Sequence, residues 1–301
     1  MRSGLRVAFD YVAAVLVPSD CRICFEPLAH LTKIPVCDAC VNSLQPAHVV
    51  ACSVCGEALD FSPAEASPLC AICRRAHPHF DFAVSYAGYD GGLRKLLHLL
   101  KYEQLRPAAK LIGAKLAQAI RLAASCGKLA TDAPEVQSSE MDHVRRNPVL
   151  VVPVPLHRAM RRQRGFNQSE LIARSALRHL DGSRFELHTG NLRRVRATVS
   201  QTGLTRHQRR ENVRGAFVVM APERIRDRCV LIVDDVYTTG TTLNECARML
   251  RSAGARQVVV GTVARVYRQA SATLGAGETQ HSSAAYGVPD QESQTAKAIA
   301  G

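Results

Sequence analysis

Tryptophan is absent from this sequence of 301 residues, and all aromatic residues together make up 5% of it. Tight binding of single-stranded nucleic acid relies on aromatic side chains that stack on the bases. The scarcity of aromatic residues therefore argues against an extended stacking surface. Apolar residues still make up 47% of the chain, which is enough for a full globular core, and the length suggests about two domains.

Lysine is absent from one long stretch, in which acidic residues are also rare. Between Arg145 and Arg214 there are 16 arginines, no lysine and four acidic residues, so this stretch alone carries a formal charge of +12. Arginine contacts phosphate and carboxylate groups in a bidentate manner that lysine does not match. We interpret the stretch as a contact surface for a phosphate-bearing partner; the alternative is a basic face that meets only solvent.

Long apolar runs are also missing, and no window approaches the length of a membrane-spanning helix. The N-terminal segment GLRVAFDYVAAVLVP is interrupted by Asp10, and no small-x-small cleavage motif precedes Cys21. We therefore predict a short amphipathic helix that packs on the body rather than a secretion signal. Without a membrane segment or a signal, we expect a cytoplasmic protein, in which thiolates stay reduced.

Cysteine, by contrast, is abundant and regularly spaced. Eight of the 11 cysteines form Cys-x-x-Cys pairs: Cys21 and Cys24, Cys37 and Cys40, Cys52 and Cys55, and Cys70 and Cys73. Two thiolates on one tight turn supply half of a tetrahedral zinc site, and a second turn supplies the rest. We predict two structural Zn²⁺ sites, in preference to reduced core cysteines. Sequential pairing of the turns is favoured because local loops close at lower entropic cost, and interleaved pairing stays open.

The chain divides into three parts by pattern. We predict a helix with a double zinc-ribbon module over residues 1–80, an α/β domain over 81–268 and a disordered tail over 269–301. Within the second part, apolar strands at 82–89, 149–155, 216–220, 229–235 and 257–265 alternate with amphipathic helices. This alternation predicts a parallel sheet with helices on both faces. A polar stretch at about 125–147 is interpreted as an inserted loop.

The stretch LIVDDVYTTGTT, residues 231–242, combines an apolar strand, two acids and a turn rich in hydroxyl groups. In an open α/β sheet, ligands bind at the carboxyl ends of the strands, where the next helix begins. The turn can hold a phosphate with backbone N–H groups and the positive helix end. Paired carboxylates beside it suit the vicinal hydroxyls of a sugar phosphate. A magnesium-dependent nucleotide site and a simple helix-capping turn are the alternatives.

The same stretch resembles the phosphoribosyl-pyrophosphate (PRPP) motif of type I phosphoribosyltransferases. Two further segments, VPVPLHRAMRRQRGFNQSELIA and QTGLTRHQRRENVRGAF, together with the four Cys-x-x-Cys pairs, resemble the ComF (ComFC/GntX-like) competence family. The resemblance covers roughly residues 5–268. It implies a type I phosphoribosyltransferase-like fold preceded by a double zinc ribbon, and the insertion at 125–147 is long for such a protein.

The resemblance also implies roles for particular residues. The paired acids of such enzymes hold the ribose hydroxyls, which implies PRPP-binding and catalytic roles for Asp234 and Asp235. The following turn holds the 5′-phosphate, which implies PRPP binding by Thr238, Thr239, Gly240, Thr241 and Thr242. PRPP is used together with Mg²⁺ in these enzymes.

The resemblance also implies that several arginines contact the diphosphate. The segment PVPLHR at 153–158 corresponds to the loop that contacts pyrophosphate, which implies diphosphate contacts for Arg158, Arg161, Arg162 and Arg164. Residues 194–214 correspond to a mobile loop that closes over the leaving pyrophosphate. Within this loop Gln201, Arg209 and Asn212 match the family pattern, and Arg209 joins the basic set.

Two functions of different classes follow. The first is a PRPP-dependent transferase linked to DNA uptake and natural transformation, whose acceptor the sequence does not identify. The second is a non-catalytic competence protein that binds single-stranded DNA, works with DNA-processing proteins and uses the same fold as a scaffold. The acceptor would be chosen by residues 82–125, where Tyr86, Tyr89 and Tyr102 either stack on a base or pack. His98 and Lys101 face either the cleft or solvent.

Overall fold

The computed structural model describes residues 19–29, 32–59, 68–129, 147–197 and 205–268. All of these residues fall within one compact unit that ends at Arg268. The predicted N-terminal helix, most of the predicted insertion, Gln201 and the predicted tail lie outside the described residues. The predicted division at residue 80 stays a prediction. In the part of the chain that is described, no helix is long and apolar enough to cross a membrane.

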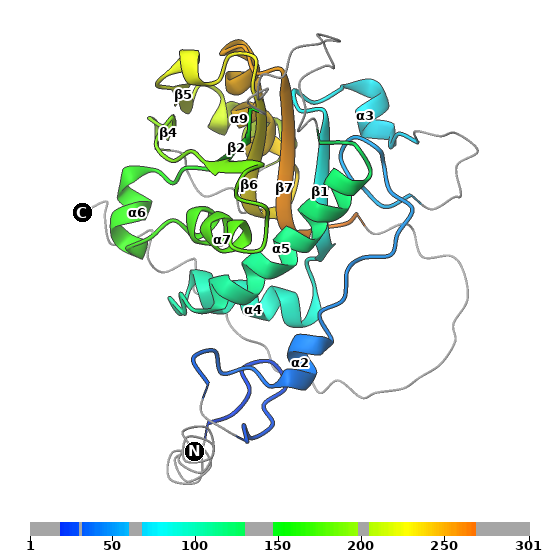
Figure 1. The fold of residues 1–301 in the computed structure, drawn as a ribbon, viewed down its shortest axis with the longest axis vertical. Coiled ribbons are helices and arrows are strands. Elements are labelled where there is room, and N and C mark those ends of the chain that lie inside the picture. Colours follow the sequence, from blue (N-terminus) through cyan, green and yellow to red (C-terminus); the bar gives the residue numbers. More distant parts are fainter. Residues whose placement is uncertain (1–18, 30–31, 60–67, 130–146, 198–204, 269–301) are drawn as a thin grey trace, which may run out of the picture. The chain divides into compact units, whose positions relative to one another are not determined.

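A parallel five-stranded sheet forms the centre of the fold (Figure 1). Its strands run in the order β1-β7-β6-β2-β3, and every neighbouring pair is parallel. The bounds are β1 (Phe82–Gly88), β7 (Gln257–Arg265), β6 (Cys229–Tyr237), β2 (Val149–Pro153) and β3 (Phe185–Leu187). The predicted parallel sheet is therefore confirmed.

Helices cover both faces of this sheet, as the strand pattern predicts. On one face Val149 and Val151 share a core with α4 (Gly91–Lys101), α5 (Ala108–Ser125) and α7 (Gln168–Leu177). On the other face Leu150 and Val152 share a core with α9 (Thr241–Ser252). Because successive strand residues point to opposite faces, each buried strand needs apolar residues at nearly every position.

A second, two-stranded sheet lies apart from the first. The segment at 216–220 does contain a strand, β5 (Phe217–Val219), but it pairs antiparallel with β4 (Leu192–Arg194) and not with the parallel sheet. Strands β4 and β5 flank a connection that contains α8 (Arg206–Val213). Helix α8 begins with a capping box between Thr205 and Gln208. The other short elements of the described segments are α2 (Asp38–Asn42), α3 (Ala71–Arg75), α6 (Arg158–Arg164) and a 3-10 turn at Pro222–Arg224.

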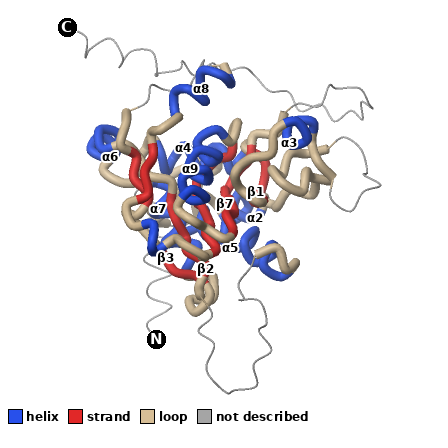
Figure 2. Tube along the Cα trace, turned by 90° about the horizontal axis from the view of Figure 1, so that it is seen from above, coloured by secondary structure: helices blue, strands red, loops and turns tan. Residues whose placement is uncertain are grey.

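The second cysteine segment packs beside β1, and both views place its helix α3 next to this strand (Figures 1 and 2). Cys21 and Cys40 belong to the core on the α4 and α5 side, whereas Cys52 and its partners belong to the core on the α9 side. The chain from Ala47, which lies between the two cysteine groups, to Val54, in the turn at 52–55, follows the outer edge of β1. There the Ala47 N–H donates to the Tyr86 carbonyl at 3.0 Å, and the Ala83 N–H donates to the Val54 carbonyl at 2.7 Å.

Candidate functional site

The turn between β6 and α9 shapes a small cavity of about 210 Å³ at the carboxyl edge of the sheet. Gly240 has a φ of +73° and comes so close to Tyr237 that a β-carbon would overlap the tyrosine hydroxyl. Only glycine fits both conditions without strain. No side chain caps α9 at Gly240, so the first turn of this helix presents backbone N–H groups to the cavity.

Most of the residues predicted to bind PRPP lie around this cavity. Its lining includes Asp234, Asp235, Thr238, Gly240, Thr241 and Thr242, together with Gln168, Ser169 and Arg194 from other elements. Thr239 does not line it; its hydroxyl lies 2.8 Å from the hydroxyl of Thr241. The structure thus brings two carboxylates and a helix N-terminus to the same small volume.

The two carboxylates differ in their surroundings. Asp234 Oδ1 accepts hydrogen bonds from the Ser169 hydroxyl at 2.7 Å and from the Asp235 N–H at 2.9 Å. Burial, with the neighbouring charge of Asp235, raises the pKa of Asp234 to about 8. Burial alone would also raise the pKa of Asp235, but the ion pair with Lys101 holds it below its usual value. Asp235 is therefore the charged member, and Asp234 is the member that takes up a proton more readily.

Lys101 reaches Asp235 from the last residue of α4. Its side chain is 18% exposed, and Asp235 is 4% exposed. Burial disfavours the charge of Lys101, yet the attraction of Asp235 raises the pKa of Lys101 above its usual value. The amphipathic pattern of α4 left open whether this lysine faces solvent or the cleft, and the structure shows that it faces Asp235, which lines the small cavity.

Helix α7 positions Ser169 beside Asp234. Asn167 precedes the helix and its side-chain oxygen accepts the Ser169 N–H at 3.1 Å, while its side-chain nitrogen donates to the Val154 carbonyl at 3.0 Å. This double contact ties the start of α7 to the loop after β2. Ser169 was not predicted as a site residue. The sequence signal for it is the asparagine cap two residues earlier, which fixes where the helix begins.

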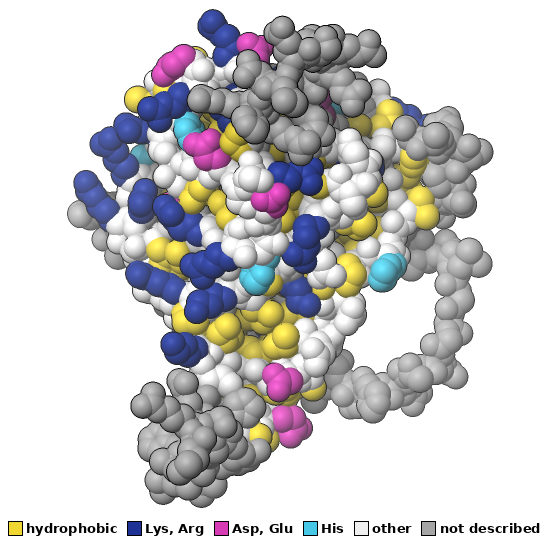
Figure 3. All heavy atoms as spheres, in the orientation of Figure 1, with side chains coloured by type: hydrophobic (Ala, Val, Ile, Leu, Met, Phe, Trp, Pro, Cys, Tyr) yellow, Lys and Arg dark blue, Asp and Glu magenta, His cyan; other side chains and the backbone are white. Residues whose placement is uncertain are grey.

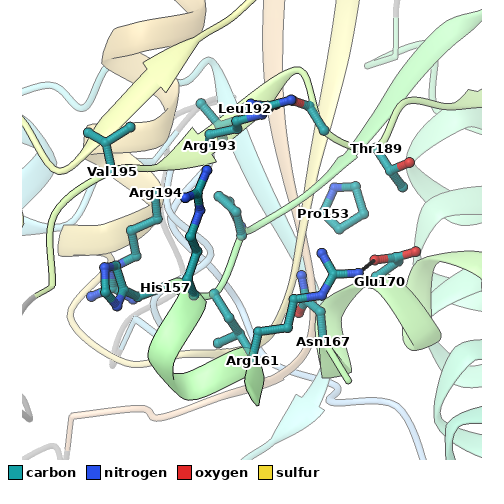
Figure 4. A pocket seen from close by; sticks show the side chains of 14 residues that line it. Pro153, His157, Arg161, Asn167, Glu170, Thr189, Leu192, Arg193, Arg194 and Val195 are labelled. Carbon is teal, nitrogen blue, oxygen red and sulfur yellow. Dashed lines mark hydrogen bonds and ion pairs between the residues drawn. The ribbon is translucent and has the colours of Figure 1, made fainter. Parts of the chain in front are cut away.

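A larger cavity of about 770 Å³ adjoins the small one, and the two share Pro155, Leu156 and Arg194 in their linings. Helix α6 contributes Arg158 and Arg161 to the larger cavity, and β4 contributes Arg193 and Arg194. Figure 4 shows Arg161 extending toward Glu170, with Asn167 beside it. Glu170 is the acidic residue in this lining; it lies 3.9 Å from Arg161 and accepts a hydrogen bond from Arg174 at 2.9 Å. The cavity is therefore strongly basic.

The predicted basic residues do not all reach this cavity. Arg158 and Arg161 line it, whereas Arg162, Arg164 and Arg209 are not among its lining residues. Arg164 donates to the Gln168 side chain at 3.0 Å, and Arg209 lies on α8, which packs against α9. Arg193 and Arg194, which do line the cavity, were missed. Figure 3 shows Lys and Arg side chains gathered over the side of the molecule where α6 and β4 lie.

Tyrosine stacking on an acceptor receives little support from the described residues of the helical segment. Tyr86 is buried, and its hydroxyl donates to the Leu44 carbonyl at 2.6 Å, so it packs in the core. Tyr102 is exposed and lies under the Arg164 guanidinium at 5.8 Å from its ring centre. Neither residue lines the cavities described above.

The eight predicted metal ligands form two groups of four. Cys21, Cys24, Cys37 and Cys40 make up the first tetrad, and Cys52, Cys55, Cys70 and Cys73 make up the second; within each, all sulfur atoms lie within 4.8 Å of one another. Tetrahedral zinc with thiolate ligands places sulfur atoms about 3.8 Å apart. The Cys24–Cys37 and Cys55–Cys70 sulfur pairs are each separated by 3.7 Å. The pairing is sequential, as predicted, and the donors fit a zinc ion.

Electrostatics at the second tetrad favour thiolate formation at one position. A hydrogen bond from Cys73, reinforced by the nearby charge of Arg265, lowers the pKa of Cys55 to about 5 although burial opposes this. In the first tetrad the Cys21 sulfur accepts N–H groups from Ile23 at 3.4 Å and from Cys37 at 3.3 Å. Such contacts orient a thiolate toward a metal ion and stabilise its charge.

Comparison with known proteins agrees with this geometry. Residues 168–275 match the family described as phosphoribosyl transferase domain. Competence protein F of Haemophilus influenzae is 28% identical over 237 residues, which cover 78% of this chain and 93% of that protein. DNA utilization protein YhgH of Salmonella typhimurium is 31% identical over 249 residues, covering 83% and 98%. YhgH of Escherichia coli K12 is 31% identical over 255 residues with the same coverage.

The parallel sheet, the acid pair and the matched family together define a phosphoribosyltransferase-like protein with two cysteine tetrads. Its similarity to the relatives extends over nearly their whole length. The chain belongs to the ComF family.

Proposed function

We propose that this protein binds PRPP in the cavity formed by the acid pair and the turn before α9, as a phosphoribosyltransferase-type protein. The observation that supports this most directly is the meeting of Asp234 and Asp235 with the N-terminus of α9 around a single small cavity. The carboxylates suit the ribose hydroxyls, and the turn at Thr238–Thr242 suits the 5′-phosphate. Thr239 then acts by holding Thr241.

The diphosphate of PRPP would extend toward the larger cavity. Arg158 and Arg161 approach this cavity from α6, and Arg194 lines both cavities. Guanidinium groups form bidentate contacts with phosphate oxygens and keep their charge when partly buried. Arg162, Arg164 and Arg209 can contribute to the field of this region, although they do not line the cavity in the described structure.

Turnover, if an acceptor is supplied, requires charge stabilisation rather than a nucleophile on the protein. Transfer in this class passes through a ribosyl cation-like state as the diphosphate leaves. In this proposal the charged Asp235 stabilises the positive charge that develops on the ribose, and the arginines stabilise the departing diphosphate. Mg²⁺ bound with PRPP would neutralise part of the diphosphate charge.

A role in DNA uptake is the biological setting that we propose for this site. The relatives named competence protein F and DNA utilization protein support it. A second function, binding of single-stranded DNA together with DNA-processing proteins, is favoured by the size and charge of the larger cavity. Sequence-independent binding depends on phosphate neutralisation, and at least four arginines face that cavity. One arginine set can serve both a diphosphate and a DNA backbone.

The cysteine tetrads complete the proposal. We assign one structural Zn²⁺ to each tetrad, within a double zinc ribbon over residues 1–80 that precedes the domain at 81–268. Thiolate ligands stay reduced in the cytoplasm, which is where we place the protein.

Calorimetric titration of PRPP with Mg²⁺ tests the proposed function. We expect heat of binding with the wild-type chain and none with the Asp234→Asn/Asp235→Asn double variant. Arg75→Gln, an exposed change on α3 away from both cavities, is the matched control and should bind as the wild type does. Absence of binding by the wild-type chain would rule the proposal out.

A further inference from the structure

One buried arginine connects the second cysteine tetrad to the turn that forms the small cavity. Arg265, the last residue of β7, is 1% exposed. Its guanidinium donates to the Cys55 carbonyl and, at 2.7 Å, to the Glu57 carboxylate. Glu57, itself 6% exposed, also accepts the Arg268 N–H at 2.9 Å. The loop that carries Cys55 and Glu57 therefore holds the Arg265 guanidinium in place.

The same guanidinium lies against the residue that supports the turn. Arg265 is paired with Tyr237 across the β6–β7 ladder, and its guanidinium carbon lies 4.0 Å from the centre of the Tyr237 ring. This is a close cation–π contact between buried groups. The Tyr237 hydroxyl lies directly beneath Gly240, at the place where a β-carbon would be. A shift of the ring would therefore shift the backbone of the turn.

The segment after Cys73 makes a second contact with the start of α9. The His79 N–H donates to the Asn244 side chain at 2.7 Å, and Phe80 packs edge-on to Tyr237 with ring centres 6.3 Å apart. Asn244 lies in the first turn of α9, where its N–H donates to the Gly240 carbonyl at 2.8 Å. Both sides of the second tetrad thus contact the elements that flank the turn.

The first tetrad has a different set of contacts. Lys95 of α4 donates to the Ile23 carbonyl at 2.8 Å, and Lys115 of α5 donates to the Leu44 carbonyl at 3.0 Å. Among the contacts of the described residues, those of this tetrad lead to the scaffold helices α4 and α5 and not to the turn at Thr238–Thr242. The two tetrads are chemically alike, but within the described residues the second adjoins the proposed phosphate site and the first does not.

We propose that Arg265 and Tyr237 are positioning residues that hold the phosphate-binding turn in place through the second tetrad. An intact second tetrad holds the loop that carries Cys55 and Glu57. This loop positions the Arg265 guanidinium. The guanidinium in turn keeps the Tyr237 ring in place under Gly240. Loss of metal from the second tetrad then loosens the turn, whereas loss from the first does not. The effect on affinity rests on the proposed function, because it concerns the 5′-phosphate of PRPP.

Hydrogen–deuterium exchange of the amides from Thr238 to Leu243, measured on the full chain, tests the positioning directly. We expect exchange about fivefold or more faster in Cys73→Ser than in the wild type, and unchanged exchange in Cys40→Ser, the matched change in the first tetrad. Glu57→Gln and Tyr237→Leu should also accelerate exchange while zinc content stays at the wild-type level. Tyr237→Phe keeps the aromatic ring over which Arg265 lies, so its exchange should be as slow as in the wild type, in contrast to Tyr237→Leu.

PRPP titration of the same variants provides the second readout. Cys73→Ser, Glu57→Gln and Tyr237→Leu should bind PRPP about fivefold or more weakly, and Cys40→Ser and Tyr237→Phe should bind close to the wild-type value. Exchange equal to the wild type in Glu57→Gln and Tyr237→Leu overturns the inference, even if Cys73→Ser does not fold. Absence of PRPP binding by the wild type overturns the proposed function alone, and the exchange measurement still decides the positioning.

Discussion

Lys101, at the end of α4, forms an ion pair with Asp235, near the end of β6, and Asp235 lines the cavity that we assign to PRPP. The pair neutralises one buried carboxylate before any ligand arrives. A ligand that brings its own cation and hydroxyl groups to Asp235 has to share this carboxylate with Lys101. The lysine is therefore part of the site and not only of the helix that carries it.

Removing this lysine should destabilise the protein. In Lys101→Met the Asp235 carboxylate keeps its burial but loses its counter-ion, so we expect a loss of about 1–3 kcal/mol in the free energy of unfolding. Urea denaturation measures this change. Lys110→Met, an exposed lysine on α5, is the control and should change stability by about 0.5 kcal/mol or less. Equal stability of both variants would contradict the importance of the ion pair.

Stability should also depend on the protonation of Asp234. Its pKa is raised to about 8 in the folded protein, whereas an unfolded aspartate titrates at about 3.9. Between these values the folded state holds a proton that the unfolded state has released, so stability falls as pH rises. Asp234→Asn keeps an oxygen for Ser169 but does not titrate.

The variant Asp234→Asn should therefore be more stable than the wild type at about pH 8, by about 1–2 kcal/mol, and this gain should shrink toward about pH 5. Thermal unfolding at the two pH values measures the difference. The same variant should bind PRPP more weakly, because an amide offers one acceptor oxygen to the ribose hydroxyls where the carboxyl group offers two. A gain in stability that does not change with pH would show that Asp234 is already ionised in the folded protein.

Gly240→Ala should damage the small cavity more than other glycine changes do. The substitution places a β-carbon against the Tyr237 hydroxyl at a residue with a φ of +73°, and we expect a loss of about 1–3 kcal/mol in stability together with weaker PRPP binding. Gly182→Ala is the control, since no atom lies within 4 Å of a β-carbon built there. Calorimetry and thermal unfolding of the two variants give the comparison.

DNA binding, if it uses the larger cavity, should be sensitive to salt. Titration of a fluorescently labelled single-stranded oligonucleotide at several salt concentrations gives the slope of affinity against salt. Each of Arg158→Gln and Arg193→Gln should reduce that slope by about 0.7 if it removes one phosphate contact. The Arg75→Gln control on α3 should leave it unchanged. An affinity that does not depend on salt would exclude this cavity as the DNA site.

Each tetrad should bind its own zinc ion independently of the other. Elemental analysis should find two zinc ions per wild-type chain, one for each tetrad, and one per chain in both Cys40→Ser and Cys73→Ser. Chelation should lower the melting temperature because folding and metal binding are coupled. A wild-type chain that contains no zinc when purified without chelators would contradict the assignment of the tetrads.

Local sequence patterns predicted those features that depend on residues close together in the chain. The tetrads close over short loops, and the Asp234–Thr242 stretch contains its strand, acids and turn in one piece, so both could be predicted. The parallel sheet followed from buried strands that alternate with helices. The acid pair then had to lie at a strand end, where ligands bind in such sheets.

Features that depend on distant segments were harder to predict. Strand β4 has three residues, two of them arginine, so it has no apolar pattern, and the contribution of Arg193 and Arg194 to the basic cavity was missed. The contact between Lys101 and Asp235 joins two elements that only the folded sheet brings together. Arg265 ends the strand predicted at 257–265, and its burial depends on an ion pair with Glu57, which lies 208 residues earlier in the sequence.

The segment between the two tetrads has a consequence for the behaviour of the protein without metal. Contacts of Ala47, in this segment, and of Val54, in the following turn at 52–55, occupy the outer edge of β1. The seven-residue strand β1 pairs with β7 on its inner edge and, among the described residues, has no neighbouring strand on its outer edge. If both tetrads lose their zinc, this covering segment is held at neither end, and β1 becomes available to the same strand of another molecule. Metal-depleted protein should then aggregate by edge-to-edge pairing of β1 strands. This aggregation should be faster than the loss of secondary structure.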